Sequence, residues 1–211
     1  MTDTDEAFWN DPVRSTTPEV RAYIILLRPY LLIIISLFVV CVVAGYLSGY
    51  YNPGIIEQLM GQFEESYGWI AGESPLVIML FIFANNTLNS FLAMLFGVVF
   101  GLWPVLFIAV NGFFIGVVVF DAAREIGILV VLAALIPHGI IELPMIFISA
   151  AMGLRLGYLA FLKISNKMDV SIKQELFQAI RFFIKVIVPL LFIAALIETF
   201  VTSPIVYLLI S

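Results

Sequence analysis

The longest stretch without a charged residue, residues 76–120, sets the strongest limit on how this chain can fold. A soluble domain has no place for so long an apolar segment, whereas a helix of about 20 apolar residues crosses a bilayer. The stretch is long enough for two such helices. We therefore predict spans at 76–102 and 105–120, joined by a tight turn at Gly101-Leu-Trp-Pro104.

Composition extends this conclusion to the whole chain. Its 211 residues are 63% hydrophobic and 12% charged, whereas a soluble domain is about 45–50% apolar and about 25% charged. Helices satisfy their own backbone hydrogen bonds in hydrocarbon, so this balance predicts an all-α, polytopic membrane helix bundle. No basic patch typical of nucleic-acid binding is present, so we exclude nucleic acid as a partner and expect the lipid bilayer instead.

Three further apolar segments complete a bundle of about five spans. They lie at residues 30–50, 128–162 and 183–210. Their lengths match or exceed what a helix needs to cross the hydrocarbon core. We therefore assign residues 23–211 to a single transmembrane domain.

The remaining segments are polar or amphipathic. Residues 1–22 contain two prolines and several acidic residues, and they predict a mobile cytoplasmic tail. Apolar residues recur at helical spacing at about 54–67 and 171–181, which predicts two amphipathic helices outside the spans. The second of these opens with a capping box, Ser171 to Gln174.

The basic residues predict the topology of the bundle. Segment 155–185 holds most of the ten Lys and Arg residues, more precede the first span, and segment 51–75 holds none. Cytoplasmic loops carry an excess of Lys and Arg. We therefore expect a multi-pass plasma-membrane protein with a cytoplasmic N-terminus and an outer C-terminus. Arg124 is the one exception, in a short charged turn.

The only histidine of the chain, His138, lies one helical turn before Glu142 within the apolar segment 128–162. Side chains four residues apart leave the same face of a helix. At about 1.5 Å per residue the segment is too long for one straight span, and Pro137 and Pro144 offer a break. We therefore predict a broken helix near residue 137, in the Pro-His-Gly-x-x-Glu-x-Pro motif, with a polar intramembrane site beside it.

Asparagines in the two central spans are candidates for the same site. Asn85, Asn89 and Asn111 either join helices through hydrogen bonds or line a functional cavity. Three further polar residues rank lower. These are Asn86, Glu198 and Arg155, and Glu198 ranks low because it lies near the outer end of its span.

Glycines at four-residue spacing accompany these polar residues and predict close helix packing. The pairs are Gly97 and Gly101, Gly112 and Gly116, and Gly153 and Gly157. Three such stripes exceed what one five-helix bundle needs. We therefore also predict a homo-oligomer, in which one stripe faces a second copy.

The segment FANNTLNSFLAMLFGVVFGLWPVLFIAVNGFFIG, followed by LIPHGIIELPMIFISAAMGLRLG, resembles the stage II sporulation protein M family of integral membrane proteins. The matching features are the asparagine-led span, the Gly-x-x-Pro turn, the Asn-Gly pair, the Pro-His-Gly core and its Gly-x-Arg-x-Gly tail. The resemblance covers about residues 80–160. It implies five spans and no enzymatic activity established for the family. In spore-forming bacteria the family member anchors two cell-wall-degrading partners. The family also occurs in organisms that never sporulate, and for these the resemblance implies no particular role.

Three functions remain open. A non-catalytic scaffold or anchor for membrane or extracytoplasmic protein partners fits the resemblance and the short loops. A transporter or channel for a small ion or solute gains support if the asparagines face His138 and Glu142, and histidine titrates near neutrality. A metal-dependent intramembrane activity is the least supported of the three functions, because His138 and Glu142 supply only two ligands and zinc usually needs three or four protein ligands. We expect no enzyme and no cofactor.

Overall fold

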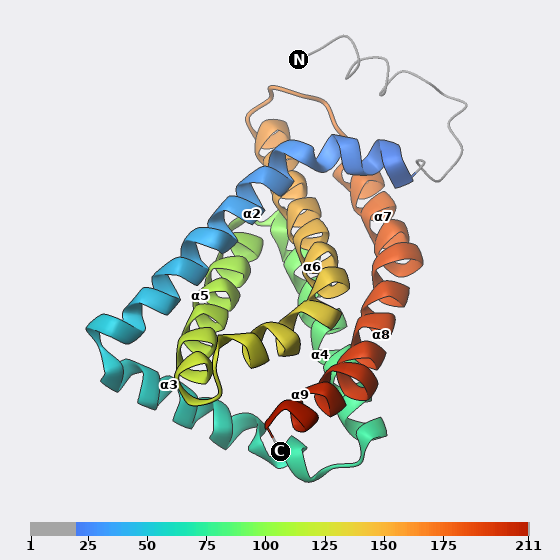
Figure 1. Cartoon of the computed structure of the whole chain (residues 1–211). Coiled ribbons are helices and arrows are strands. Elements are labelled where there is room, and N and C mark those ends of the chain that lie inside the picture. Colours follow the sequence, from blue (N-terminus) through green and yellow to red (C-terminus); the bar gives the residue numbers. More distant parts are fainter. Residues whose placement is uncertain (1–19, 211) are drawn as a thin grey trace.

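The computed structural model describes residues 20–210, and every regular element in this range is helical (Figure 1). Five helical units in this range are long and apolar enough to cross a membrane. They are α2 (Val20–Tyr51), α4 with its 3-10 turn η2 (Pro75–Val98), α5 (Leu102–Glu125), α6 (Ile128–Ile164) and the continuous unit Ile172–Ile210. The prediction of an all-α, multi-pass membrane protein with about five spans is confirmed. Of the predicted tail, residues 1–19 lie outside the described range.

The first amphipathic helix, α3 (Pro53–Tyr67), follows α2 directly and continues into the 3-10 turn η1 (Gly68–Gly72). Its apolar face packs on the bundle: Ile56 is buried, and the rings of Phe63 and Phe114 lie 5.2 Å apart. The glutamates of its other face are exposed, so α3 shields one end of the bundle and presents carboxylates outward.

Helix α5 continues past the predicted end of its span at residue 120 to Glu125. Residues 122–125, Ala-Ala-Arg-Glu, are good helix formers, so the helix continues beyond the apolar segment. The turn itself is confined to Ile126 and Gly127, where Gly127 adopts a positive φ of 85°. Hydropathy marks where the bilayer ends, whereas hydrogen bonding decides where the helix ends.

Helix α6 is continuous from Ile128 to Ile164, so the predicted break near residue 137 is wrong. Pro137 and Pro144 lie inside the helix, where a proline removes one backbone hydrogen bond and its ring pushes against the preceding turn. The result is a bend in the axis. Figure 1 shows the first part of α6 running across the bundle before the helix turns along it.

The last span combines α-helical and π-helical turns. It consists of α7 (Ile172–Phe182), π turn η3 (Phe183–Ile187), α8 (Val188–Ile197), π turn η4 (Glu198–Thr202) and α9 (Ser203–Ile210). Each π turn comes directly before a proline-containing turn, with Pro189 after η3 and Pro204 after η4. A proline ring collides with the carbonyl four residues earlier, and a wider turn relieves this collision. The serine half of the predicted capping box is present at the start of α7, where Ser171 Oγ accepts a bond from the backbone N–H of Gln174 at 3.4 Å.

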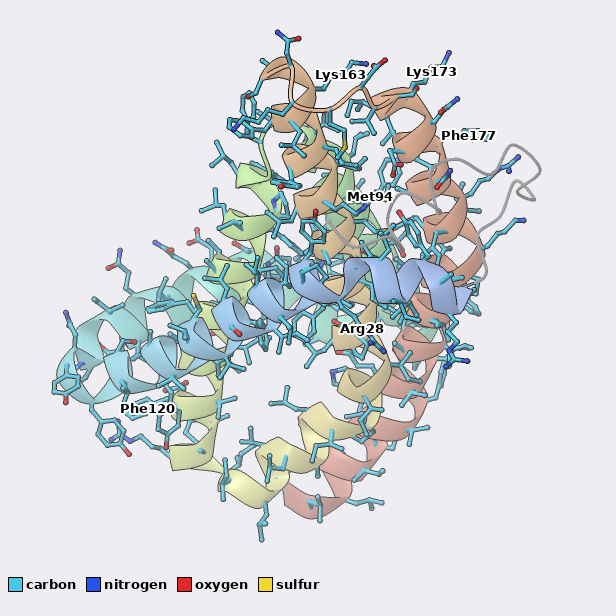
Figure 2. All side chains as sticks on the ribbon, turned by 90° about the horizontal axis from the view of Figure 1, so that it is seen from above. Arg28, Met94, Phe120, Lys163, Lys173 and Phe177 are labelled. Atoms are coloured by element: carbon cyan, nitrogen blue, oxygen red, sulfur yellow. The ribbon has the colours of Figure 1, made fainter. Side chains whose placement is uncertain are left out.

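Charged residues separate between the two ends of the bundle. The start of α2 and the α6–α7 connection lie at the same end in Figure 1, and Figure 2 shows Lys163 and Lys173 beside that connection. We call this the basic end. The opposite end carries α3 and the α5–α6 turn, and we call it the acidic end.

The glycines of α5 bring it against α2. A Cβ on Gly116 would fall on the carbonyl oxygen of Val42, and one on Gly112 would lie 2.9 Å from the carbonyl oxygen of Phe38. The approach is mutual, because a Cβ on Gly45 of α2 would fall on the Phe113 carbonyl oxygen. These two backbones therefore touch, as the predicted stripe requires.

A second glycine contact joins the end of α4 to α6. Gly97 faces the backbone of Gly153, and Gly157 faces that of Gly97 and Gly101. All three predicted stripes are therefore used within the chain. The homo-oligomer stays a prediction, but the surplus stripe on which it rested does not exist.

Candidate polar intramembrane site

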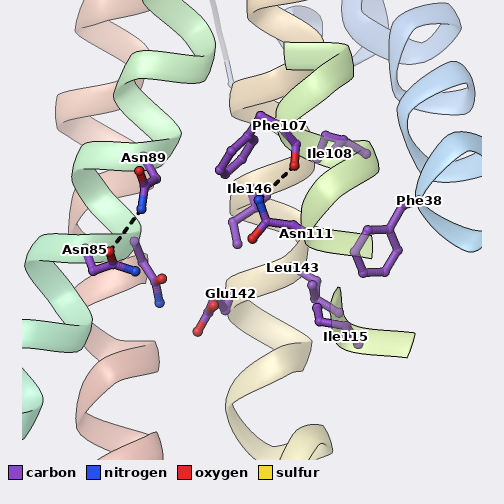
Figure 3. A pocket seen from close by; sticks show the side chains of 11 residues that line it. Phe38, Asn85, Asn89, Phe107, Ile108, Asn111, Ile115, Glu142, Leu143 and Ile146 are labelled. Atoms are coloured by element: carbon purple, nitrogen blue, oxygen red, sulfur yellow. Dashed lines mark hydrogen bonds between the residues drawn. The ribbon is translucent and has the colours of Figure 1, made fainter. Parts of the chain in front are cut away.

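A cavity of about 80 Å³ lies among four helices near the middle of the bundle. Its lining residues come from α2, α4, α5 and α6. The polar ones are Asn85, Asn86, Asn89, Asn111 and Glu142. Figure 3 shows Asn85 and Asn89 on α4 and Asn111 on α5 around the space that Glu142 of α6 enters. A cavity of this size holds several water molecules.

The asparagine hydrogen bonds remain within their own helices. Asn89 Nδ2 donates to Asn85 Oδ1 at 3.0 Å, and Asn111 Nδ2 donates to the Phe107 carbonyl at 2.8 Å (Figure 3). Neither bond joins two helices. An asparagine side chain has two donor hydrogens and an acceptor oxygen, so these bonds leave polar capacity for an occupant of the cavity. The arrangement fits a cavity lining better than helix-to-helix bonding.

Glu142 also belongs to a second group, which extends toward the last span. The ligand atoms of His138, Glu142 and Glu198 all lie within 4.8 Å of one another. The first two come from the bent part of α6, and Glu198 opens the π turn η4. The sequence ranked Glu198 below His138 and Glu142, and the structure places it beside them. Because α6 bends and packs against both η4 and α9, the C-terminal part of the last span reaches the His138 turn.

Several polar atoms of this region are buried without a hydrogen-bond partner. They include His138 Nδ1 and Glu142 Oε2. Thr199 and Thr202 of η4 are also buried, with exposed fractions of 7% and 4%, and their hydroxyl oxygens have no partner. These threonines were not among the residues predicted from the sequence. The polar run Glu-Thr-Phe-Val-Thr-Ser inside an apolar span was the signal that could have identified them.

Arg155 does not belong to this site. It pairs with Glu175 of α7 in a buried ion pair, with side-chain exposures of only 4% for both partners. Tyr23 of α2 lies close enough to both charges to interact with them, and its ring packs 4.9 Å from that of Phe182. Arg155 therefore ties α6 to α7. Glu175 was also missed, although an acid in so basic a segment was a signal.

The charge of the site determines what it can bind. Glu142 and Glu198 place two carboxylates in an apolar bundle, and no Lys or Arg is among the described residues that line the cavity. Both residues are half-buried, and a carboxylate withdrawn from water requires a proton or a cation. The site is therefore suited to a small cation, with amide and carboxylate oxygens as its contacts.

Comparisons with known proteins agree with the motifs found in the sequence. The family model for Stage II sporulation protein M matches residues 33–203, a range that contains every residue of the polar site. An uncharacterized protein of Methanocaldococcus jannaschii is 32% identical over 128 residues, which are 59% of this chain and 70% of that protein. No solved structure matches the chain. The chain therefore belongs to the stage II sporulation protein M family of membrane proteins.

Proposed function

We propose that this protein carries a small cation across the membrane through the site formed by Glu142, the asparagine-lined cavity and the His138–Glu198 cluster. The observation that supports the proposal is that Asn85 and Asn89 on one helix face Glu142 on another across a cavity. A purely structural role for the asparagines would be expected to show as hydrogen bonds between helices, but their bonds stay within their own helices. An ionisable group that faces a polar cavity within a membrane is characteristic of ion pathways.

The bent helix strengthens this proposal. Transporter sites commonly lie near the middle of the membrane, where a helix deviates from regular geometry and frees backbone groups. Here the bend of α6 and the π turn η4 meet at the cluster. Passage of a cation needs no covalent step, so the proposal assigns no enzymatic activity.

A flux assay tests the proposal. We expect proteoliposomes that contain the full chain to pass protons, Na⁺, K⁺ or a divalent cation faster than empty liposomes. Glu142→Gln should lower that flux by at least about tenfold, because the substitution removes the negative charge that attracts the cation. A tenfold loss of affinity corresponds to about 1.4 kcal/mol of cation binding. Glu64→Gln is the matched control, since Glu64 is an exposed carboxylate of α3, and it should leave the flux unchanged.

Two results would contradict transport. One is the absence of flux for every cation from protein that is monodisperse and thermally stable. The other is equal flux from wild type and Glu142→Gln. Either result would favour the second candidate function, a non-catalytic scaffold for membrane or extracytoplasmic partners. The exposed carboxylates of α3 support that candidate, because they offer a charged surface at the acidic end.

We infer in addition that the basic end faces the cytoplasm of a plasma membrane, which places the N-terminus inside and the C-terminus outside. The excess of Lys and Arg at that end supports this orientation. Single cysteines at Lys167 and Glu64, in a Cys41→Ala background, test it in intact cells. A membrane-impermeant thiol reagent should label position 64 and leave position 167 unmodified until the cells are opened. The reverse pattern would invert the topology.

A further inference from the structure

We infer that His138, Glu142 and Glu198 form a binding site for a divalent transition-metal ion such as Zn²⁺, Mn²⁺ or Fe²⁺. This inference rests on the proposed function, because it names the class of cation that the site takes. It assigns each of the three side chains the role of a direct ligand.

The geometry brings three ligands from two separate helices together. His138 and Glu142 are one turn apart on α6, and Glu198 approaches from η4, with all ligand atoms within 4.8 Å of one another. In a tetrahedral site with metal–ligand distances near 2.0–2.2 Å, neighbouring ligand atoms lie about 3.4 Å apart. The difference is small on the scale of a side-chain rotation, so the two helices already lie at a suitable separation.

The two α6 side chains carry atoms that lack another partner. His138 Nδ1 and Glu142 Oε2 are buried and make no hydrogen bond. A buried polar atom without a partner costs about 1–3 kcal/mol. A metal ion would satisfy both atoms at once and would neutralise the two carboxylates, and the described residues that line the cavity beside Glu142 include no Lys or Arg.

The donor set selects the class of ion. One imidazole nitrogen and two carboxylate oxygens suit borderline divalent metals such as Zn²⁺, Mn²⁺ and Fe²⁺. Ca²⁺ and Mg²⁺ prefer shells built entirely of oxygen, and Cu⁺ prefers sulfur ligands. Three protein ligands also leave a coordination position open. The cavity that Glu142 lines lies beside it, so an ion can exchange with water there.

The π turn at Glu198 supports a ligand role for this residue. Glu198 is the first residue of η4, and its carbonyl oxygen accepts a bond from Ser203 Oγ at 3.0 Å. Isolated π turns occur frequently at functional sites.

The single histidine of the chain permits a decisive spectroscopic test. Full-length protein is purified in detergent with an affinity tag that contains no histidine, and Mn²⁺ or Cu²⁺ is added as a paramagnetic probe. Pulsed electron paramagnetic resonance should detect coupling between the metal and an imidazole nitrogen, which can come only from His138. This test needs no variant, and the absence of nitrogen coupling at a saturating metal concentration would overturn the inference.

Equilibrium dialysis with Zn²⁺ gives the second arm of the test. Wild type should bind one Zn²⁺ per chain, and thermal unfolding should shift upward on addition of Zn²⁺ because the ion binds the folded state. His138→Ala and Glu198→Gln should each lower the Zn²⁺ affinity by at least about 100-fold, which corresponds to about 2.7 kcal/mol. Glu73→Gln, an exposed carboxylate at the acidic end, is the matched control and should bind as wild type does.

The binding assays and the flux assay separate this inference from the proposed function. Zn²⁺ binding that requires His138 and Glu198, without flux of any cation, supports the metal site and contradicts transport. Flux of protons or monovalent cations, without nitrogen coupling or Zn²⁺ binding, supports transport and overturns the metal site. Equal Zn²⁺ binding by wild type and both ligand variants also overturns the metal site.

Discussion

Replacement of Arg155 by methionine is expected to lower the free energy of unfolding by about 3–5 kcal/mol. The guanidinium of Arg155 donates to Oε2 of Glu175, and both side chains are almost fully buried between α6 and α7. Removal of the arginine leaves the Glu175 carboxylate buried without its cation. Unfolding midpoints of the two proteins in the same detergent, by heat or by denaturant, measure the loss.

The double variant Arg155→Met/Glu175→Leu separates the loss of a pair from the loss of packing. Apolar side chains of similar volume can replace a buried ion pair at little cost. We therefore expect the double variant to recover most of the stability that Arg155→Met loses. Lys163→Met, at an exposed position of the same helix, should change the stability by less than about 0.5 kcal/mol. A double variant less stable than Arg155→Met would contradict this account of the pair.

Substitution of Gly153 is expected to separate α4 from α6, with an effect that grows with side-chain size. A Cβ on Gly153 would meet the Ala93 carbonyl oxygen and lie 3.2 Å from the Cα of Met94. Both are backbone atoms, so no side-chain rotation can relieve the contact. Gly153→Ala should cost about 1–3 kcal/mol and Gly153→Leu more than that. Thermal unfolding in detergent measures both.

Gly61 offers the matched control for this series. It lies within α3, and a Cβ there would meet nothing within 4 Å. Alanine has a higher helix propensity than glycine, so Gly61→Ala should stabilise the protein by about 0.5–1 kcal/mol. Equal effects of alanine at positions 61 and 153 would show that backbone contact between α4 and α6 contributes little to stability.

The span count, the helical class and the polar residues of α4 and α6 were predictable from the sequence alone. A bilayer demands long apolar helices, so an uncharged run such as 76–120 identifies spans without knowledge of their packing. The one-turn spacing of His138 and Glu142 places both on one helical face, because that relation is local. The same holds for the helix cap at Ser171.

Contacts between distant segments were decided only by the tertiary structure. The length of the apolar segment and the position of Pro137 predicted an interruption but could not distinguish a broken helix from a bent one. Neighbouring helices decide whether the helix continues through a proline. The packing of α6 against the last span brings Glu198 close to His138 and Arg155 into an ion pair with Glu175. The glycine stripes were visible in the sequence, but their partners within the chain were not. A helix determines its own faces by its period, whereas the face that meets another helix depends on bends and crossing positions set by the whole bundle.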